Sequence, residues 1–130
     1  MKKSYILDTS ALITYFSDEP GSEEVNTVIM ADNSVNISEI SIMEIYYIFI
    51  RKADENKARE VVRKIEELGI ISIEISRTIL FNGARIKAQH PLSLADAIIA
   101  ATAIELQAQL IHKDPEFKPL TNRIKLVSLV

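Results

Sequence analysis

Short apolar runs alternate with longer amphipathic stretches along the whole chain. Five apolar runs have the length of buried strands and cover residues 4–7, 35–37, 70–75, 109–111 and 124–127. Apolar residues at helical spacing fill the segments between them, over residues 10–16, 22–31, 39–51, 54–68, 77–89 and 93–107. Strands that alternate with helices predict a three-layer α/β/α fold with a mostly parallel sheet of four to five strands.

Turn residues separate these elements at the expected places. Pro20 and Gly21 follow the first helical segment, Gly69 follows the fourth, and Pro91 follows the fifth. The sequence contains no internal repeat, low-complexity stretch or linker, and a chain of 130 residues is large enough to bury about two thirds of its unfolded surface. We therefore expect residues 1–130 to form a single domain.

Four acidic residues interrupt the apolar segments. Asp8 and Asp114 each follow a predicted strand, whereas Glu44 and Asp96 lie in apolar helical segments, in what the pattern predicts to be their first turns. A buried carboxylate is costly unless it is paired, hydrogen-bonded or bound to metal. Because sites in parallel sheets lie beyond the carboxyl ends of the strands, all four acids are expected to meet there around one divalent cation. Such a site points to metal-dependent phosphodiester chemistry.

Helix capping is the alternative interpretation of each acid, since acids and hydroxyls commonly begin helices. Each acid fits a known capping pattern at a helix start: Asp8 before its helix, Ser41 with Glu44, Ser93 with Asp96, and Asp114 before Pro115. Capping acids normally lie at wet helix ends, but the neighbours of Glu44 and Asp96 three and four positions away are largely apolar. The joint pattern of four acids therefore favours a metal site.

Composition narrows the possible classes of protein. Apolar residues are 48% and charged residues 25%, as in ordinary globular proteins. The longest apolar run, residues 40–50, is too short and too polar to span a membrane, and the first residues fit no signal peptide. The absence of cysteine excludes disulfides and thiolate chemistry and is compatible with the cytoplasm. The net charge of −3 lacks the basic excess of a dedicated nucleic-acid binder, although the four site acids account for its sign.

In these features the chain resembles the PIN-domain ribonucleases, and most closely the VapC-type toxins of bacterial and archaeal toxin–antitoxin modules. The resemblance rests on four segments that contain the acids and together extend over essentially the whole chain: residues 5–12, 38–44, 94–103 and 110–117. It implies an endoribonuclease that depends on Mg²⁺ or Mn²⁺, with Asp8, Glu44, Asp96 and Asp114 as metal ligands and catalytic residues. It also implies a homodimer and a small antitoxin whose C-terminal segment covers the active site.

The resemblance assigns further roles around these acids. In similar proteins the hydroxyl after the first acid, here Ser10 or Thr9, positions a metal-bound water. His112 departs from the family pattern, which commonly has threonine or serine two residues before the last acid. Glu116 has two interpretations: an acid that supports the metal ligands, or an acidic residue that merely lies at the start of a helix. We favour the second.

RNA must reach an acidic site past basic and apolar surfaces. Lys113, Lys118 and Arg123 are the candidates for phosphate contacts, whereas the six basic residues in 51–64 alternate with acids and predict a helix with ion pairs. The apolar helix over 39–51 carries more bulky residues than one face can bury. It therefore predicts an exposed apolar groove or a dimer surface.

Three other functions compete with a nuclease. A Mg²⁺-binding phosphoacceptor domain needs an acidic pair at the end of the first strand, but Leu7 and Thr9 flank Asp8. A haloacid-dehalogenase-type phosphatase needs a second aspartate where this chain has Ser10. A catalytically silent PIN-like interaction module remains, and the presence of all four acids argues against it.

Overall fold

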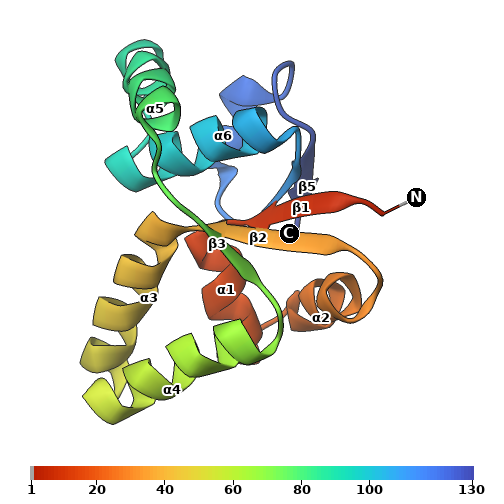
Figure 1. Ribbon diagram of the computed structural model, residues 1–130, viewed down its shortest axis with the longest axis vertical. Helices are drawn as coiled ribbons and strands as arrows, with labels where there is room; N and C mark the ends of the chain where they lie inside the picture. Colours follow the sequence, from red (N-terminus) through yellow and green to blue (C-terminus); the bar gives the residue numbers. More distant parts are fainter. Residues whose placement is uncertain (1) are drawn as a thin grey trace.

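Five parallel strands form the central sheet of this protein, whose computed structural model describes residues 2–130 (Figure 1). The strands are β1 (Ser4–Leu7), β2 (Ser34–Ser38), β3 (Ile71–Ile73), β4 (Gln109–His112) and β5 (Leu126–Ser128). The helices are α1 (Thr9–Phe16), α2 (Ser22–Met30), α3 (Glu39–Lys52), α4 (Glu55–Glu67), α5 (Arg77–Gln89), α6 (Leu94–Leu106) and the 3₁₀ helix η1 (Pro115–Leu120). The predicted three-layer α/β/α fold is confirmed.

The first strand lies in the middle of the sheet, whose order is β3-β2-β1-β4-β5. Ile6 is aligned with Asn36 of β2 on one side and with Leu110 of β4 on the other. All neighbouring pairs among the described strands are parallel, so their carboxyl ends lie at the same edge. Residues that follow β1 and β4 are therefore brought together, although they are far apart in the sequence.

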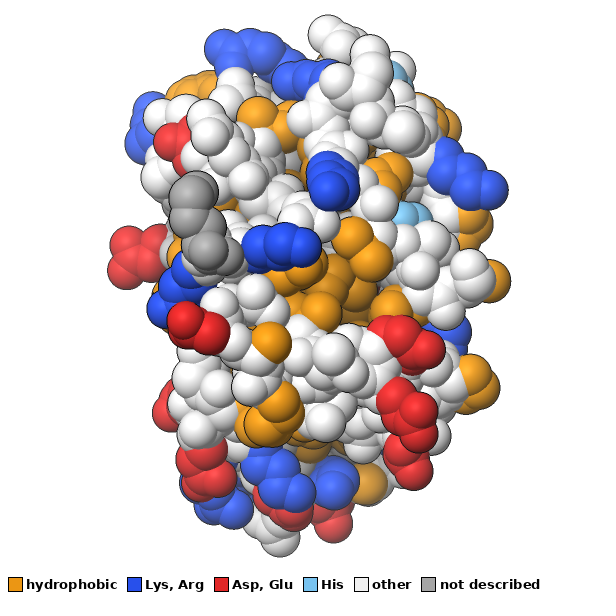
Figure 2. Space-filling model, turned by 90° about the vertical axis from the view of Figure 1, so that its right-hand side faces the viewer, with side chains coloured by type: hydrophobic (Ala, Val, Ile, Leu, Met, Phe, Trp, Pro, Cys, Tyr) orange, Lys and Arg blue, Asp and Glu red, His pale blue; other side chains and the backbone are white. Residues whose placement is uncertain are grey.

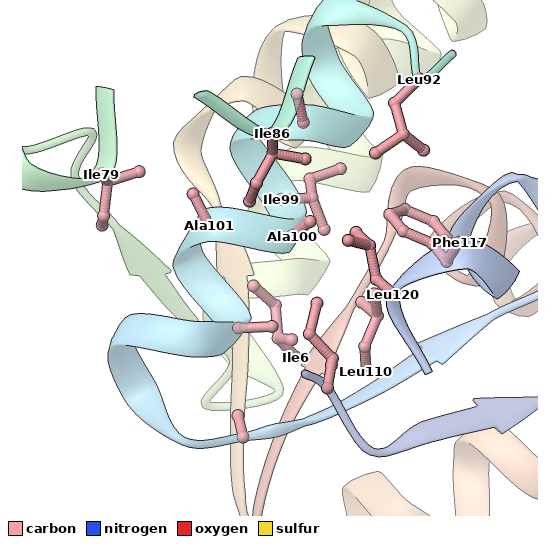
Figure 3. Close-up of a cluster of buried hydrophobic side chains, with 14 residues drawn as sticks. Ile6, Ile79, Ile86, Leu92, Ile99, Ala100, Ala101, Leu110, Phe117 and Leu120 are labelled. Atoms are coloured by element: carbon pink, nitrogen blue, oxygen red, sulfur yellow. The ribbon is translucent and has the colours of Figure 1, made fainter. Parts of the chain in front are cut away.

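Helices cover both faces of the sheet, and successive residues of a strand point into different cores. Ile6 and Leu110 pack beneath α5, α6 and η1, as the close-up in Figure 3 shows. Leu7 and Ile111 belong to the opposite core, which they form with α1, α2, α3 and α4. Burial on both faces explains why the central strands are continuous apolar runs and not alternating ones.

Two edge strands are shorter than the sequence predicts. The predicted strand over 70–75 is ordered as β3 for three residues only, and the backbone N–H of Ile75 donates to the Glu39 side chain at 3.1 Å. A side chain thus takes the place of the next ladder bond. The predicted strand over 124–127 begins later, at Leu126. Within residues 2–130, no helix has the length and apolar character needed to cross a membrane.

Candidate metal centre

The predicted acids lie at the carboxyl edge of the sheet. Asp8 directly follows β1, and Asp114 lies two residues beyond β4, which is the neighbour of β1. Asp96 is in the first turn of α6, as predicted. Glu44 is not in the first turn of α3, because that helix begins at Glu39, as predicted, and Glu44 lies five residues further on. Its side chain is therefore carried one turn further along the helix than the sequence pattern suggested.

Asp8 is held by groups from its own segment and is only 1% exposed. The backbone N–H of Ala11 donates to its Oδ1 at 2.7 Å, and the Ser10 hydroxyl lies 2.8 Å from both carboxylate oxygens. The Ser10 oxygen in turn accepts the backbone N–H of Lys113 at 3.1 Å. Asp8 thus caps α1, as the capping interpretation predicted. Ser10 also links Asp8 to the segment that carries Asp114.

Glu44 is oriented by a hydroxyl from a neighbouring helix. Thr9 Oγ1 donates to Glu44 Oε1 at 2.6 Å and lies 3.0 Å from the hydroxyl of buried Ser41. The capping pair that the sequence suggested for Ser41 and Glu44 does not form, because Ser38 caps α3 by accepting the N–H of Ile40 at 3.2 Å. The hydroxyls of Thr9 and Ser10 therefore hold carboxylates in place.

Three further acids form a close cluster. One carboxylate oxygen from each of Asp96, Asp114 and Glu116 lies within 4.8 Å of the other two. The Ser93 hydroxyl accepts the N–H of Asp96 at 3.1 Å, so this half of the predicted capping pair forms. Asp114 caps η1 by accepting the N–H of Glu116 at 3.1 Å. Glu116 is in the first turn of η1, as preferred from the sequence, but it also joins the acid cluster, which the sequence gave little reason to expect.

Burial and mutual repulsion change the pKa values of two of these acids. Burial raises the pKa of Asp8 to about 7, and the negative charges of Asp114 and Glu44 add to it against the hydrogen bonds from Ala11 and Ser10. Burial also raises the pKa of Asp96 to about 8, together with the hydrogen bond and charge of Glu116 and the charge of Asp8. The charges of Asp114 and Glu44 thus act against ionisation of Asp8, and that of Glu116 acts against ionisation of Asp96. An added cation would relieve this repulsion.

The donor atoms of the cluster suit a hard divalent cation. Its carboxylate oxygens are the ligands that Mg²⁺ and Mn²⁺ prefer, and the chain has no thiolate to favour a softer metal. The buried ring of His112 is already engaged, because its Nδ1 lies 2.6 Å from the backbone oxygen of Asp114. The residues present therefore fit an oxygen-ligated cation.

Of the three predicted phosphate-contacting residues, Lys113 and Lys118 line one pocket beyond β4, whereas Arg123 lies elsewhere. The Lys113 ammonium group donates to the Pro20 carbonyl at 3.1 Å and lies 3.7 Å from Glu19, so it is directed toward the α1–α2 turn. Lys118 is exposed on η1. Arg123 lies beside Gln109 at the start of β4, at the sheet edge opposite the acids. Figure 2 shows the face that carries the start of β1, where acidic and basic side chains are interspersed around an apolar centre.

The surfaces of α3 and α4 agree with their sequence patterns. Four ion pairs join neighbouring turns of α4 at 3.3–3.9 Å, as its alternating charges predict. An apolar groove of about 730 Å³ runs beside α3 and includes Ile40, Met43 and Tyr47. Met43 is 68% exposed, whereas Phe49 of the same helix is buried. The exposed apolar groove predicted for this helix is therefore present.

The sequence matches the family model of the PIN domain over residues 5–121. This chain belongs to the PIN domain family. The matched range includes all four predicted acids and Glu116. A search of curated proteins found no significant match.

Solved structures share the fold of this PIN domain over nearly its whole length. A toxin–antitoxin complex from Klebsiella pneumoniae is 24% identical, with a TM-score of 0.76 over 97% of this chain and 98% of that chain. VapBC2 from Rickettsia felis, bound to a DNA fragment of its promoter, is 18% identical, with a TM-score of 0.80 over 96% and 98%. VapC20 from Mycobacterium tuberculosis is 13% identical, with a TM-score of 0.74 over 88% and 93%. At these identities the similarity establishes the fold.

Proposed function

We propose that this PIN-domain protein is a metal-dependent endoribonuclease and the toxin of a VapBC-type toxin–antitoxin system. The observation that carries the proposal is the cluster of Asp96, Asp114 and Glu116, together with Asp8, whose pKa is raised in part by the charges of Asp114 and Glu44. The raised pKa values of Asp8 and Asp96 support it, because burial and neighbouring acids disfavour their charged forms and no basic group offsets this. The similar VapC20 is described as a toxin that cleaves the sarcin–ricin loop, which favours RNA as the substrate class.

In the proposed site, Asp8, Glu44, Asp96 and Asp114 hold Mg²⁺ or Mn²⁺, and Glu116 offers a further oxygen. When bound, the cation supplies Lewis acidity toward a phosphoryl oxygen and lowers the pKa of the attacking water. Ser10 and Thr9 orient the carboxylates of Asp8 and Glu44 through the hydrogen bonds described above. Their own part in positioning water follows from the family resemblance.

Partners follow from the same relatives. The similar structures from Klebsiella pneumoniae, Rickettsia felis and Salmonella typhimurium are toxin–antitoxin complexes, so we propose a small antitoxin protein as the partner of this chain. We further propose a homodimer in the cytoplasm, with the apolar groove beside α3 as a protein-contacting surface.

Substitution of Asp96 by asparagine tests the catalytic assignment, because it removes a charge while keeping the side-chain size. We expect Asp96→Asn to lower the rate of Mn²⁺-dependent RNA cleavage by at least about 100-fold, in line with loss of a group that acts in the transition state. Glu105→Gln is the matched control, since Glu105 is an exposed acid near the other end of α6. Cleavage is measured on a defined RNA, with and without excess chelator.

Each outcome of this experiment discriminates between functions. Full activity of Asp96→Asn, or of the unaltered protein in chelator, would refute the metal-dependent assignment. Mn²⁺ binding without cleavage of any RNA by the unaltered protein would instead favour the silent interaction module. Equal losses in Asp96→Asn and Glu105→Gln would show that the loss is not specific to Asp96 and would refute its catalytic role.

A further inference from the structure

We propose that His112 is a positioning residue that fixes the direction of the Asp114 carboxylate, an inference that rests on the proposed metal site. Threonine or serine is common at this place in similar proteins, so the histidine is a feature of this chain. The residue is only 2% exposed, so little of it is accessible to RNA. Its contacts are instead with the segment that carries the last predicted acid.

In the hydrogen bond between His112 and Asp114, only the histidine can be the donor. Nδ1 lies 2.6 Å from the backbone oxygen of Asp114, and a carbonyl oxygen can only accept a hydrogen bond. Nδ1 must therefore carry the proton, as it does in one of the two neutral tautomers. The same ring packs edge-on against Phe117, with centroids 5.5 Å apart, so the donor is held by the core beneath η1.

The segment that receives this bond is held at several points, and the Asp114 carboxylate itself accepts the N–H of Glu116 at 3.1 Å. Lys113 and Asp114 form a bend between β4 and η1, outside both elements. On the near side, Leu129 donates to the His112 carbonyl at 2.8 Å and Ser10 accepts the Lys113 N–H at 3.1 Å. The His112 ring supplies the contact at the carbonyl of Asp114 itself. Without it, the Asp114 carbonyl would lose this hydrogen bond, and the carboxylate beside Asp96 and Glu116 would be held less firmly, by the N–H of Glu116.

Two substitutions separate positioning from simple packing. In His112→Asn, the side-chain amide nitrogen is bonded to the same carbon as Nδ1 and keeps a donor near its position, but the ring is lost. In His112→Phe, the ring and its contact with Phe117 remain, but the donor is lost. If His112 acts by packing alone, the phenylalanine variant should be the better tolerated. If His112 acts through its donor, the order is reversed.

The first measurement uses the metal-free protein in EDTA, so it does not depend on the proposed function. Hydrogen exchange of the Lys113 amide reports opening of the bend. We expect His112→Phe to accelerate this exchange about tenfold and His112→Asn to leave it within about threefold of the unaltered protein. Melting temperatures in EDTA verify folding, and His112→Leu is a second donor-free variant if the phenylalanine variant does not fold. Slower exchange in His112→Phe than in His112→Asn would overturn the proposal.

The second measurement titrates Mn²⁺ into the same variants by calorimetry. Loss of a group that orients a metal ligand commonly costs about 10–100-fold in metal affinity, so His112→Phe should bind Mn²⁺ at least about tenfold more weakly and His112→Asn should not. Unchanged Mn²⁺ affinity in His112→Phe would also overturn the proposal. If the unaltered protein binds no Mn²⁺, the proposed metal site fails, while the exchange measurement still decides what His112 does to the bend.

Discussion

The carboxylate of Asp8 is almost completely buried, yet its hydrogen bonds come from groups within three residues along the chain. Such local donors allow an acid to stand at the end of a buried strand without a basic partner. They also leave part of its charge uncompensated, since the pKa of Asp8 remains raised to about 7 by burial. A residue of this kind caps a helix and remains available to a cation.

A substitution at Thr9 tests how far one hydroxyl supports the site. Thr9→Val keeps the shape of the side chain but removes the donor to Glu44 and the partner of Ser41. We expect a loss of about 1–3 kcal/mol in the free energy of unfolding, because buried polar groups are left unpaired, together with weaker Mn²⁺ binding. Urea unfolding and calorimetric titration measure the two effects.

Thr9→Ser is the control for this prediction, since it retains the hydroxyl. The assignment of Thr9 as an orienting residue would be wrong if the serine variant lost as much Mn²⁺ affinity as the valine variant. Equal stability of both variants would show that the hydrogen bond at 2.6 Å contributes little to folding.

At this scale the sequence identifies the acids better than it identifies their surroundings. Asp8, Glu44 and Asp96 interrupt apolar segments, and this conflict with burial is visible without a structure. Glu116 is exposed and follows a proline, so its local pattern resembles any helix start. Its place in the acid cluster depends on how the chain bends between β4 and η1, which the residue pattern does not encode.

Among the elements, α5 and α6 pack closely at Gly83. A Cβ atom at Gly83 would lie 3.5 Å from the carbonyl oxygen of Ala97 and 3.6 Å from Cα of Ile98, which is ordinary van der Waals contact. The space therefore admits one methyl group, but a larger side chain would have to displace α6.

Gly83→Ala is accordingly expected to stabilise the protein. Alanine loses less backbone freedom on folding than glycine, so the free energy of unfolding should rise by about 0.4–1 kcal/mol, as measured by urea unfolding. Gly83→Val should destabilise it, because its branched side chain meets the backbone of α6 and is disfavoured in a helix. A clear loss of stability in the alanine variant would mean that α5 and α6 tolerate no added volume.

The elements themselves are predicted well where their ends are marked by local chemistry. The bounds of α5 match the expected residues 77–89, since Ser76 caps its start and the helix ends at His90, just before Pro91. Gly69 follows α4 with a φ of 77°, as its position suggested. The extent of β3 could not be predicted, because the side chain that replaces its next hydrogen bond comes from Glu39 on a different element.

For the whole molecule, the two raised pKa values couple stability to pH. Those of Asp8 and Asp96 are about 7 and about 8, above the ordinary value of 3.8 that applies in the unfolded chain. Between about pH 4 and pH 8 the folded protein therefore binds more protons than the unfolded chain, so a rise in pH destabilises it. We expect the melting temperature in EDTA to fall from pH 5 to pH 8, and Mn²⁺ to restore it at pH 8.

Asp96→Asn removes one of the two titrating groups and should flatten this dependence. Its melting temperature in EDTA should exceed that of the unaltered protein at pH 8 by about 4 °C, which corresponds to about 1 kcal/mol in a chain of this size. The two proteins should converge near pH 5. If the difference in melting temperature did not grow with pH, the raised pKa of Asp96 would be contradicted.

The two cores lie on opposite faces of the same central strands, since Ile6 and Leu7 of β1 enter one each. Neither core can be completed without β1 and β4. We therefore propose that residues 1–130 fold as one domain.

The central place of β1 has a consequence for how a cell could make this protein. On a ribosome β1 and Asp8 are made before β4 and the acid that follows it, because α1 to α6 lie between them in the sequence. A nascent chain therefore holds only part of the acid cluster. If the proposed activity is correct, the toxin becomes able to cut RNA only after the segment that carries Asp114 and Glu116 has been made and β4 has paired with β1.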